Sequence, residues 1–118
     1  MYGLPRDADL TFMMNRELLQ VCVGSNEAIL HFDDDLSITI MTTVRHEVSG
    51  SPIAVYEDSP ASAAALVRFL GCSLLEIKAD EAGNMRMIFS NGETLEILDE
   101  DPHYECYLIR HHDRVIVV

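Results

Sequence analysis

The chain has 118 residues, of which 48% are hydrophobic and 24% charged, and its 20 acidic and 8 basic side chains give a formal net charge of −12. This length is that of one ordinary domain, and this composition is typical of a folded globular protein, not of a disordered or membrane-spanning one. The negative charge repels phosphate backbones and anionic lipids, so it disfavours nucleic acid and membranes as partners and favours a basic protein.

The first strand pattern begins after a short predicted helix, Leu10–Asn15, that Asp9 can cap. Period-2 alternation then predicts strands over residues 18–23 and 28–32, joined by the turn Gly24–Asn26. A third strand begins at Leu36 after three consecutive aspartates, and its β-branched residues predict an extension towards Val48.

Between the strand patterns lie a short strand, Ile53–Tyr56, and one helix over about residues 60–70. Ser59 offers an N-cap oxygen, Pro60 suits the first helical position, and Gly71 marks the end. We expect the helix to place an apolar stripe on the sheet, made up of Ala63, Leu66, Val67 and Leu70.

The second strand pattern repeats the first, with predicted strands over residues 74–79, 85–89 and 94–98. Two further strands follow, over residues 104–109 and 115–118, with a turn at His111–Asp113. The predicted fold is therefore α+β, a duplicated three-stranded antiparallel β-meander with one connecting helix packed on the sheet. We predict a single domain over residues 1–118 with an internal repeat, 16–48 and 72–110, although any two meanders share some pattern.

The alternation also predicts which side chains form the core. These are Leu19, Val21, Val23, Leu30, Phe32, Ile38, Leu75, Ile77, Met87, Phe89, Leu95 and Ile97. Three cysteines without metal-binding spacing are expected to be reduced thiols in packing positions. The N-terminus lacks the features of a secretion signal, so we expect a cytoplasmic protein.

Familiar catalytic signatures are missing from the sequence: it has no glycine-rich phosphate loop, nucleophile elbow, zinc-binding cysteine pair or His-Glu-x-x-His helix. One constellation, made up of His103, Glu105, His111, His112 and Asp113, has residue types that could bind a divalent metal. Its spacing matches no known ligand set, and neighbouring strand residues point to opposite faces. We therefore expect a solvated turn there, and no metal, cofactor or catalytic residue in the chain.

Two groups of residues are candidates for binding a partner. The first is the acidic turn Asp33, Asp34 and Asp35, which a basic surface could contact. The second is Tyr104, Glu105 and Tyr107. Packing within the core or on the sheet is the favoured role for the tyrosines, but Glu105 and Tyr107 share one strand face, opposite Tyr104, and an acidic and aromatic face suits an interface.

Four blocks of the chain look familiar: Tyr2-Gly3-Leu4-Pro5 with Asp7, Leu19-Gln20-Val21-Cys22-Val23-Gly24, Phe89-Ser90-Asn91-Gly92, and the Tyr-Glu-x-Tyr-x-Ile block that starts at Tyr104. With these blocks the chain resembles a family of small bacterial proteins of unknown function. The resemblance spans nearly the whole chain and implies a compact single-domain bacterial protein. It brings no catalytic residue with it.

Size, charge and missing catalytic motifs together favour a non-enzymatic protein–protein interaction module that binds a basic partner, such as an immunity protein that neutralises a toxin. The alternative is a small-molecule-binding or hydrolytic domain, which requires a pocket between sheet and helix lined by polar groups. Self-association through unpaired sheet edges to form a homo-oligomer is a third candidate.

Overall fold

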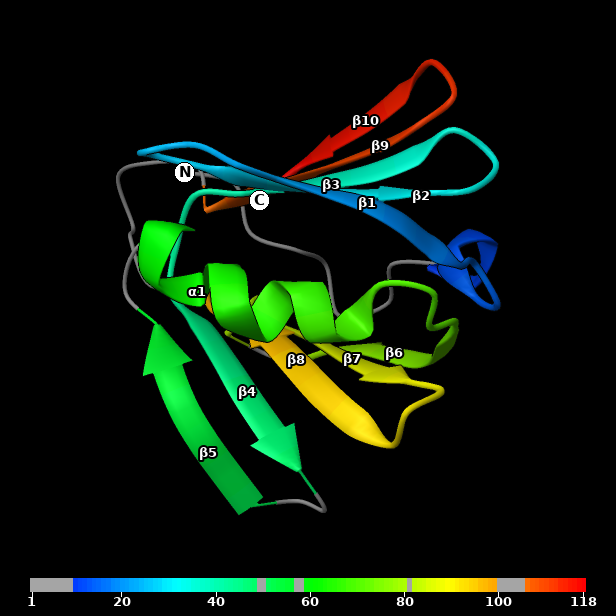
Figure 1. Cartoon of the computed structure of the whole chain (residues 1–118). Coiled ribbons are helices and arrows are strands. Elements are labelled where there is room, and N and C mark those ends of the chain that lie inside the picture. Colours follow the sequence, from blue (N-terminus) through cyan, green and yellow to red (C-terminus); the bar gives the residue numbers. More distant parts are fainter. Residues whose placement is uncertain (1–9, 49–50, 57–58, 81, 100–105) are drawn as a thin grey trace.

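The computed structural model describes residues 10–48, 51–56, 59–80, 82–99 and 106–118. These residues form two antiparallel five-stranded sheets, one α-helix and two short 3-10 helices, which confirms the α+β fold with a duplicated meander (Figure 1). The first sheet has the order β1-β2-β3-β9-β10, with β1 Leu18–Val23, β2 Ala28–Phe32, β3 Leu36–Ile40, β9 Tyr107–His111 and β10 Arg114–Val117. The second has the order β5-β4-β8-β7-β6, with β4 Val44–Val48, β5 Ser51–Tyr56, β6 Leu74–Ala79, β7 Met85–Phe89 and β8 Glu93–Ile97.

The hairpin that follows each meander in the chain pairs with the sheet of the other meander. The hairpin β4–β5 follows the first meander in sequence, yet β4 pairs with β8 of the second meander. The hairpin β9–β10 follows the second meander, and β9 pairs with β3 of the first. The predicted extension of the third strand towards Val48 is therefore wrong, because the chain leaves the first sheet after Ile40 and crosses to the second. Neither sheet is complete without strands from both parts of the chain.

The entries to the two meanders have matching backbone contacts. The 3-10 helix η1 (Thr11–Met13) precedes β1, and η2 (Val67–Phe69) precedes β6. Leu18 N–H donates to the Cys72 carbonyl at 2.9 Å, and Leu74 N–H donates to the Arg16 carbonyl at the same distance. The two meanders are thus tied together at their first strands by a reciprocal pair of hydrogen bonds. The η1 turn lies where the short N-terminal helix was predicted.

The helix α1 (Ser59–Leu66) contacts β1, β2 and β5, so it touches both sheets and lies between them at one side (Figure 1). Its buried side chains, continuing into η2, are Ser62, Ala65, Leu66 and Phe69. The predicted stripe is therefore rotated by one residue, and Val67 and Leu70 are exposed. Burying the large Phe69 ring removes more apolar area from water than burying Val67 would, so the turn presents Phe69 to the core.

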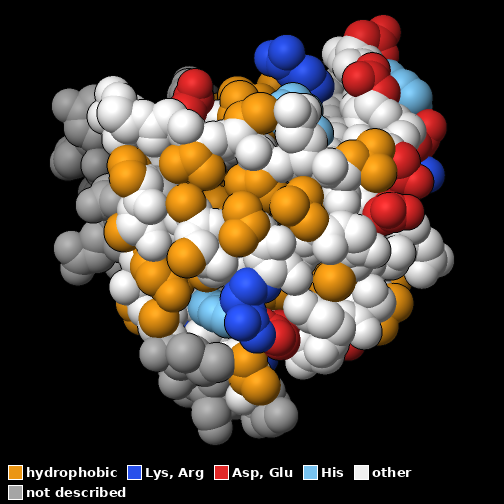
Figure 2. Space-filling model, viewed as in Figure 1, with side chains coloured by type: hydrophobic (Ala, Val, Ile, Leu, Met, Phe, Trp, Pro, Cys, Tyr) orange, Lys and Arg blue, Asp and Glu red, His pale blue; other side chains and the backbone are white. Residues whose placement is uncertain are grey.

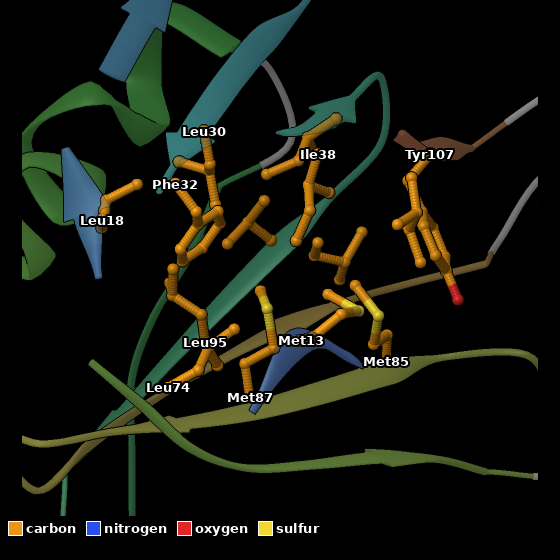
Figure 3. Packing of buried hydrophobic residues seen from close by; sticks show 14 of the residues in the cluster. Met13, Leu18, Leu30, Phe32, Ile38, Leu74, Met85, Met87, Leu95 and Tyr107 are labelled. Atoms are coloured by element: carbon orange, nitrogen blue, oxygen red, sulfur yellow. The ribbon is translucent and has the colours of Figure 1, made fainter. Parts of the chain in front are cut away.

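The core lies between the two sheets, where side chains from both of them point towards one another (Figure 3). Seven of the predicted core residues are buried: Leu30, Phe32, Ile38, Met87, Phe89, Leu95 and Ile97. Val21 and Ile77 are half-buried against this cluster. The prediction is wrong for Val23, which is exposed near the end of the edge strand β1, and for Leu19 and Leu75.

Leu19 and Leu75 fail for the same physical reason. The pairing of β1 with β2 shifts register between Leu18 and Gln20, and the pairing of β6 with β7 shifts between Leu74 and Glu76. A bulge adds one residue to a strand, so the alternation changes face at that point. Leu18 and Leu74 are fully buried in consequence, and the leucine that follows each of them is exposed.

No helix among the described residues is long and apolar enough to cross a membrane.

Candidate functional site

The turn between β2 and β3 carries the acidic residues that the sequence singled out. Asp34 and Asp35 have positive φ angles of 58° and 57°, a left-handed conformation that aspartate tolerates better than most residues. Asp33 is a structural anchor, since its Oδ1 accepts a hydrogen bond from the Glu17 N–H at 3.0 Å and its own N–H donates to the Glu17 carbonyl. Asp35 is more exposed than Asp34, with 78% of its side chain accessible against 39%. The three aspartates therefore have different roles, and Asp35 presents most of its side chain to solvent.

The turn between β9 and β10 lies beside this acidic turn, because β3 pairs with β9 and Leu36 pairs with His111. His111 Nε2 lies 3.0 Å from Asp34 Oδ2, and Arg16 Nη2 lies 2.9 Å from the same oxygen. His112 Nε2 lies 3.7 Å from the other carboxylate oxygen, Oδ1. The hydrogen bond with His111, followed by the positive charges of Arg16 and His112, holds the pKa of Asp34 below its usual value.

Aromatic contacts fix the orientation of His111. Its ring stacks on the Phe12 ring with 4.9 Å between centroids. The guanidinium of Arg114 lies over the same Phe12 ring, 5.3 Å from its centroid. The rings of His111 and His112 are 4.2 Å apart. We call this end of the first sheet the acidic end and define it by its exposed carboxylates, Glu17, Asp33, Asp34, Asp35 and Asp113.

The acidic end combines two predictions that the sequence kept apart. The Asp33–Asp35 turn and the His111–Asp113 turn are far apart in the chain, and the sheet brings them together. Asp34, His111 and His112 are the group of three metal-ligating side chains found among the described residues, with ligand atoms within 4.8 Å of one another. His103, Glu105 and Tyr104 lie outside the described residues.

Tyr107, the remaining predicted binding residue, lies in the core. It is fully buried, and its hydroxyl donates a hydrogen bond to the Gly83 carbonyl at 2.7 Å. Burial, together with the negative charges of Asp99 and Asp80, raises its pKa far above the usual tyrosine value. Its position agrees with the packing alternative and removes it from any exposed binding face.

A second site, which sequence reasoning missed, lies where α1 faces the strands β4 and β5. A hollow of about 320 Å³ is lined by His46, Tyr56, Ala64, Ala65 and Arg68, and we call it the helix–sheet hollow. Figure 2 looks onto this face and shows a histidine, a basic and an acidic side chain together below the helix, with hydrophobic side chains around them.

The polar wall of the helix–sheet hollow is a hydrogen-bonded cluster. Arg68 donates to both carboxylate oxygens of Glu93, from Nε at 3.0 Å and from Nη2 at 2.6 Å. His46 Nε2 lies 2.6 Å from Glu93 Oε1, and the His46 ring packs edge-on against Phe69. The hydrogen bond from Arg68, followed by that from His46, holds the pKa of Glu93 below its usual value. The signal in the sequence was His46 at an inward position of strand Val44–Val48, where an apolar residue is expected.

No family model, curated protein or solved structure matches this chain.

Proposed function

We propose that this protein is a non-enzymatic protein–protein interaction module whose acidic surface binds a basic partner. An immunity-type protein that neutralises a basic toxin in the cytoplasm is the specific form of this proposal. The observation that supports it is that most of the described lysine and arginine side chains form ion pairs within the fold.

The described basic side chains are largely committed to internal ion pairs. Each of the following has a carboxylate oxygen within 2.9 Å: Arg16, Arg45, Arg68, Lys78 and Arg86. Because the sequence has 20 acidic and 8 basic side chains, such pairing leaves an excess of negative charge. A surface with this excess attracts cationic molecules and speeds their association, an effect that salt screens.

The acidic end is the part of the surface that fits this role best. In Figure 2, acidic and histidine side chains gather at the upper right, over the tips of β2–β3 and β9–β10 in Figure 1. Asp35 and Asp113 are exposed there, and both lie on turns that the sheet holds side by side. A rigid pair of turns that presents carboxylates to solvent is a suitable contact for lysine and arginine side chains.

The test is affinity capture of the tagged protein from lysate of its native cell, washed at low and at high salt, followed by binding measurements with the purified partner. The double variant D35N/D113N removes two exposed charges without touching the structural hydrogen bonds of Asp33. We expect it to weaken binding at low salt and to reduce the salt dependence, because surface charges act chiefly on the association rate.

The control is E27Q/E76Q, which removes two carboxylates away from the acidic end: Glu27 is exposed, and Glu76 is half-exposed and paired with Lys78. It should bind nearly as well as the wild type. Equal losses in both double variants would contradict a specific role for the acidic end. A partner retained undiminished at high salt would contradict the electrostatic basis of the proposal.

A second candidate function is the binding of a small molecule in the helix–sheet hollow. The favouring observation is that an open hollow lies between helix and sheet with His46 and Arg68 on its wall, as such a function requires. A fragment screen by NMR tests it, with expected shifts in the amides next to His46 and Arg68. The variant A64L, which places a larger side chain on the lining, should abolish those shifts. Fragments that bind A64L and the wild type alike would argue against this site.

A further inference from the structure

We propose that Asp34, His111 and His112 form a binding site for one divalent transition-metal ion of the zinc type. Two imidazoles and one carboxylate are a ligand set that zinc and its neighbours accept, and it leaves a position open for a further ligand. This inference does not rest on the proposed partner binding, because it concerns the protein alone with a metal ion.

The backbone explains how two consecutive histidines come to face the same carboxylate. Neighbouring residues in a strand point to opposite faces, and this had argued against a site in the sequence. His112, however, follows the last residue of β9 and has a positive φ of 55°. That left-handed turn brings the His112 ring back beside the His111 ring, with 4.2 Å between their centroids.

The third ligand is held in place from a different hairpin. Asp34 lies in the β2–β3 turn, which is fixed beside the β9–β10 turn by the pairing of Leu36 with His111. His112 N–H also donates to the Asp35 carbonyl at 3.2 Å, which ties the two turns directly. Backbone hydrogen bonds therefore hold the two turns beside each other, so only side-chain adjustments remain to be made when a metal binds.

The distances suit a metal ion with small adjustments. Ligand atoms about 2.0–2.2 Å from a tetrahedral zinc lie about 3.3 Å from one another. His111 Nε2 is 3.0 Å from Asp34 Oδ2, His112 Nε2 is 3.7 Å from the other oxygen Oδ1, and the three ligand atoms all lie within 4.8 Å of one another. The cluster must therefore contract when a metal binds, and His112 is the exposed member whose side chain has room to move.

The surroundings of the three ligands resemble an outer coordination shell. Metal-bound histidines are commonly oriented by a carboxylate on the other ring nitrogen, and bound carboxylates accept further hydrogen bonds. Arg16 donates to Asp34 Oδ2 at 2.9 Å, and Asp35 Oδ2 faces His112 Nδ1 at 3.9 Å, which is beyond hydrogen-bond distance. Phe12 stacks on His111 and limits its rotation. The guanidinium charge of Arg16 opposes a cation, and the carboxylates of the acidic end offset it.

The strand pairing of this fold does not require a histidine at position 111. In the other sheet, Val48 pairs with Glu93 as His111 pairs with Leu36, so an apolar residue stands at the equivalent place. The β7–β8 turn has Asn91 at the position of Asp34, with a different backbone: Gly92 has a positive φ there, whereas Asp34 and Asp35 both have positive φ angles in the β2–β3 turn.

The experiment is titration of the purified full chain with Zn²⁺ alone by calorimetry, repeated with Co²⁺ by visible absorption. We expect one ion per chain, with Co²⁺ ligand-field bands and no thiolate charge-transfer band. The variants D34N and H112Q should each lower the affinity at least about 10-fold, since loss of even an outer-shell partner of a metal ligand costs 10–100-fold. Asparagine tolerates the left-handed backbone at position 34, and His112 is exposed, so both variants should fold.

Two matched controls separate ligation from general attraction. D113N makes the same charge change as D34N in the neighbouring turn, and H31Q removes a histidine outside the cluster. Both should bind Zn²⁺ within about two- to threefold of the wild type. The proposal is overturned if the wild type binds no stoichiometric Zn²⁺, if D113N loses as much affinity as D34N, or if H112Q binds like the wild type.

Discussion

Tyr107 offers the sharpest test of how the core is built, through the substitution Tyr107→Phe. The change deletes one hydroxyl from a fully buried ring and leaves the Gly83 carbonyl without the hydrogen bond that it accepts at 2.7 Å. A buried acceptor that loses its partner costs about 1–3 kcal/mol, and the apolar contacts of the ring are kept. We therefore expect Y107F to lower the free energy of unfolding by about 1–3 kcal/mol.

Urea unfolding followed by circular dichroism measures this loss as a lower midpoint at an unchanged slope. The matched control is Y56F, because Tyr56 is a half-buried residue at the edge of the helix–sheet hollow, where water can replace its hydroxyl. Its effect should stay below about 0.5 kcal/mol. A Y107F protein within 0.5 kcal/mol of the wild type, or equal losses in both variants, would refute the assignment of a structural hydrogen bond to Tyr107.

The pH dependence of the same pair provides an independent check. Because the pKa of Tyr107 is raised in the folded state, its contribution to stability is complete below the unfolded pKa of about 10 and declines as pH rises above it. The wild type should therefore lose stability faster than Y107F in alkaline solution, and the two should converge. Parallel curves above pH 10 would mean that Tyr107 ionises normally in the fold.

Three further predictions concern stability. Because the pKa of Glu93 is lowered in the folded state, the stability that its ionised form contributes is present above pH 4.5 and is lost as pH falls through the folded pKa. The variant R68Q should therefore make the free energy of unfolding less dependent on pH below 4.5. An unchanged pH dependence would count against the Arg68–Glu93 pair. Leu74→Ala should cost about 2–5 kcal/mol and Leu75→Ala less than about 0.5 kcal/mol in chemical unfolding, whereas similar costs would contradict the bulge. Phe89→Ala should cost about 3–5 kcal/mol, and a loss below 2 kcal/mol would mean that the ring is not central to the core.

Local patterns in the sequence predicted the elements of the fold well. Strands 18–23, 28–32, 74–79 and 85–89 have the predicted bounds, because alternation and turn residues within a few positions determine them. Ser59 and Gly71 likewise bracket the helical segment, and Gly71 has the positive φ that a helix end favours. What failed nearby was the face of a side chain. At Leu19 and Leu75 a bulge changed the alternation, and at Val67 the burial of Phe69 decided which face of the helical segment points inward.

The candidate site was predictable only in part. The sequence named Asp34, His111 and His112 as members of two separate turns, and it missed the cluster of His46, Arg68 and Glu93. Each group joins residues that are far apart in the chain, and nothing local to one residue indicates the others. The sequence left Tyr107 with two roles, packing in the core or lying on a binding face, and the structure places it in the core because the second sheet covers that side of its strand.

By itself the sequence determined the class of the fold, the strands of both meanders and the acidic character of the surface, because these follow from residue type, short-range periodicity and charge. Only the tertiary structure decided that the hairpins β4–β5 and β9–β10 exchange sheets, which side chains meet at the acidic end, and that Tyr107 is buried. Pairing between distant strands depends on the free energy gained when whole sheet faces are buried against each other. That free energy arises only when the strands are assembled, so no single segment of the sequence indicates it.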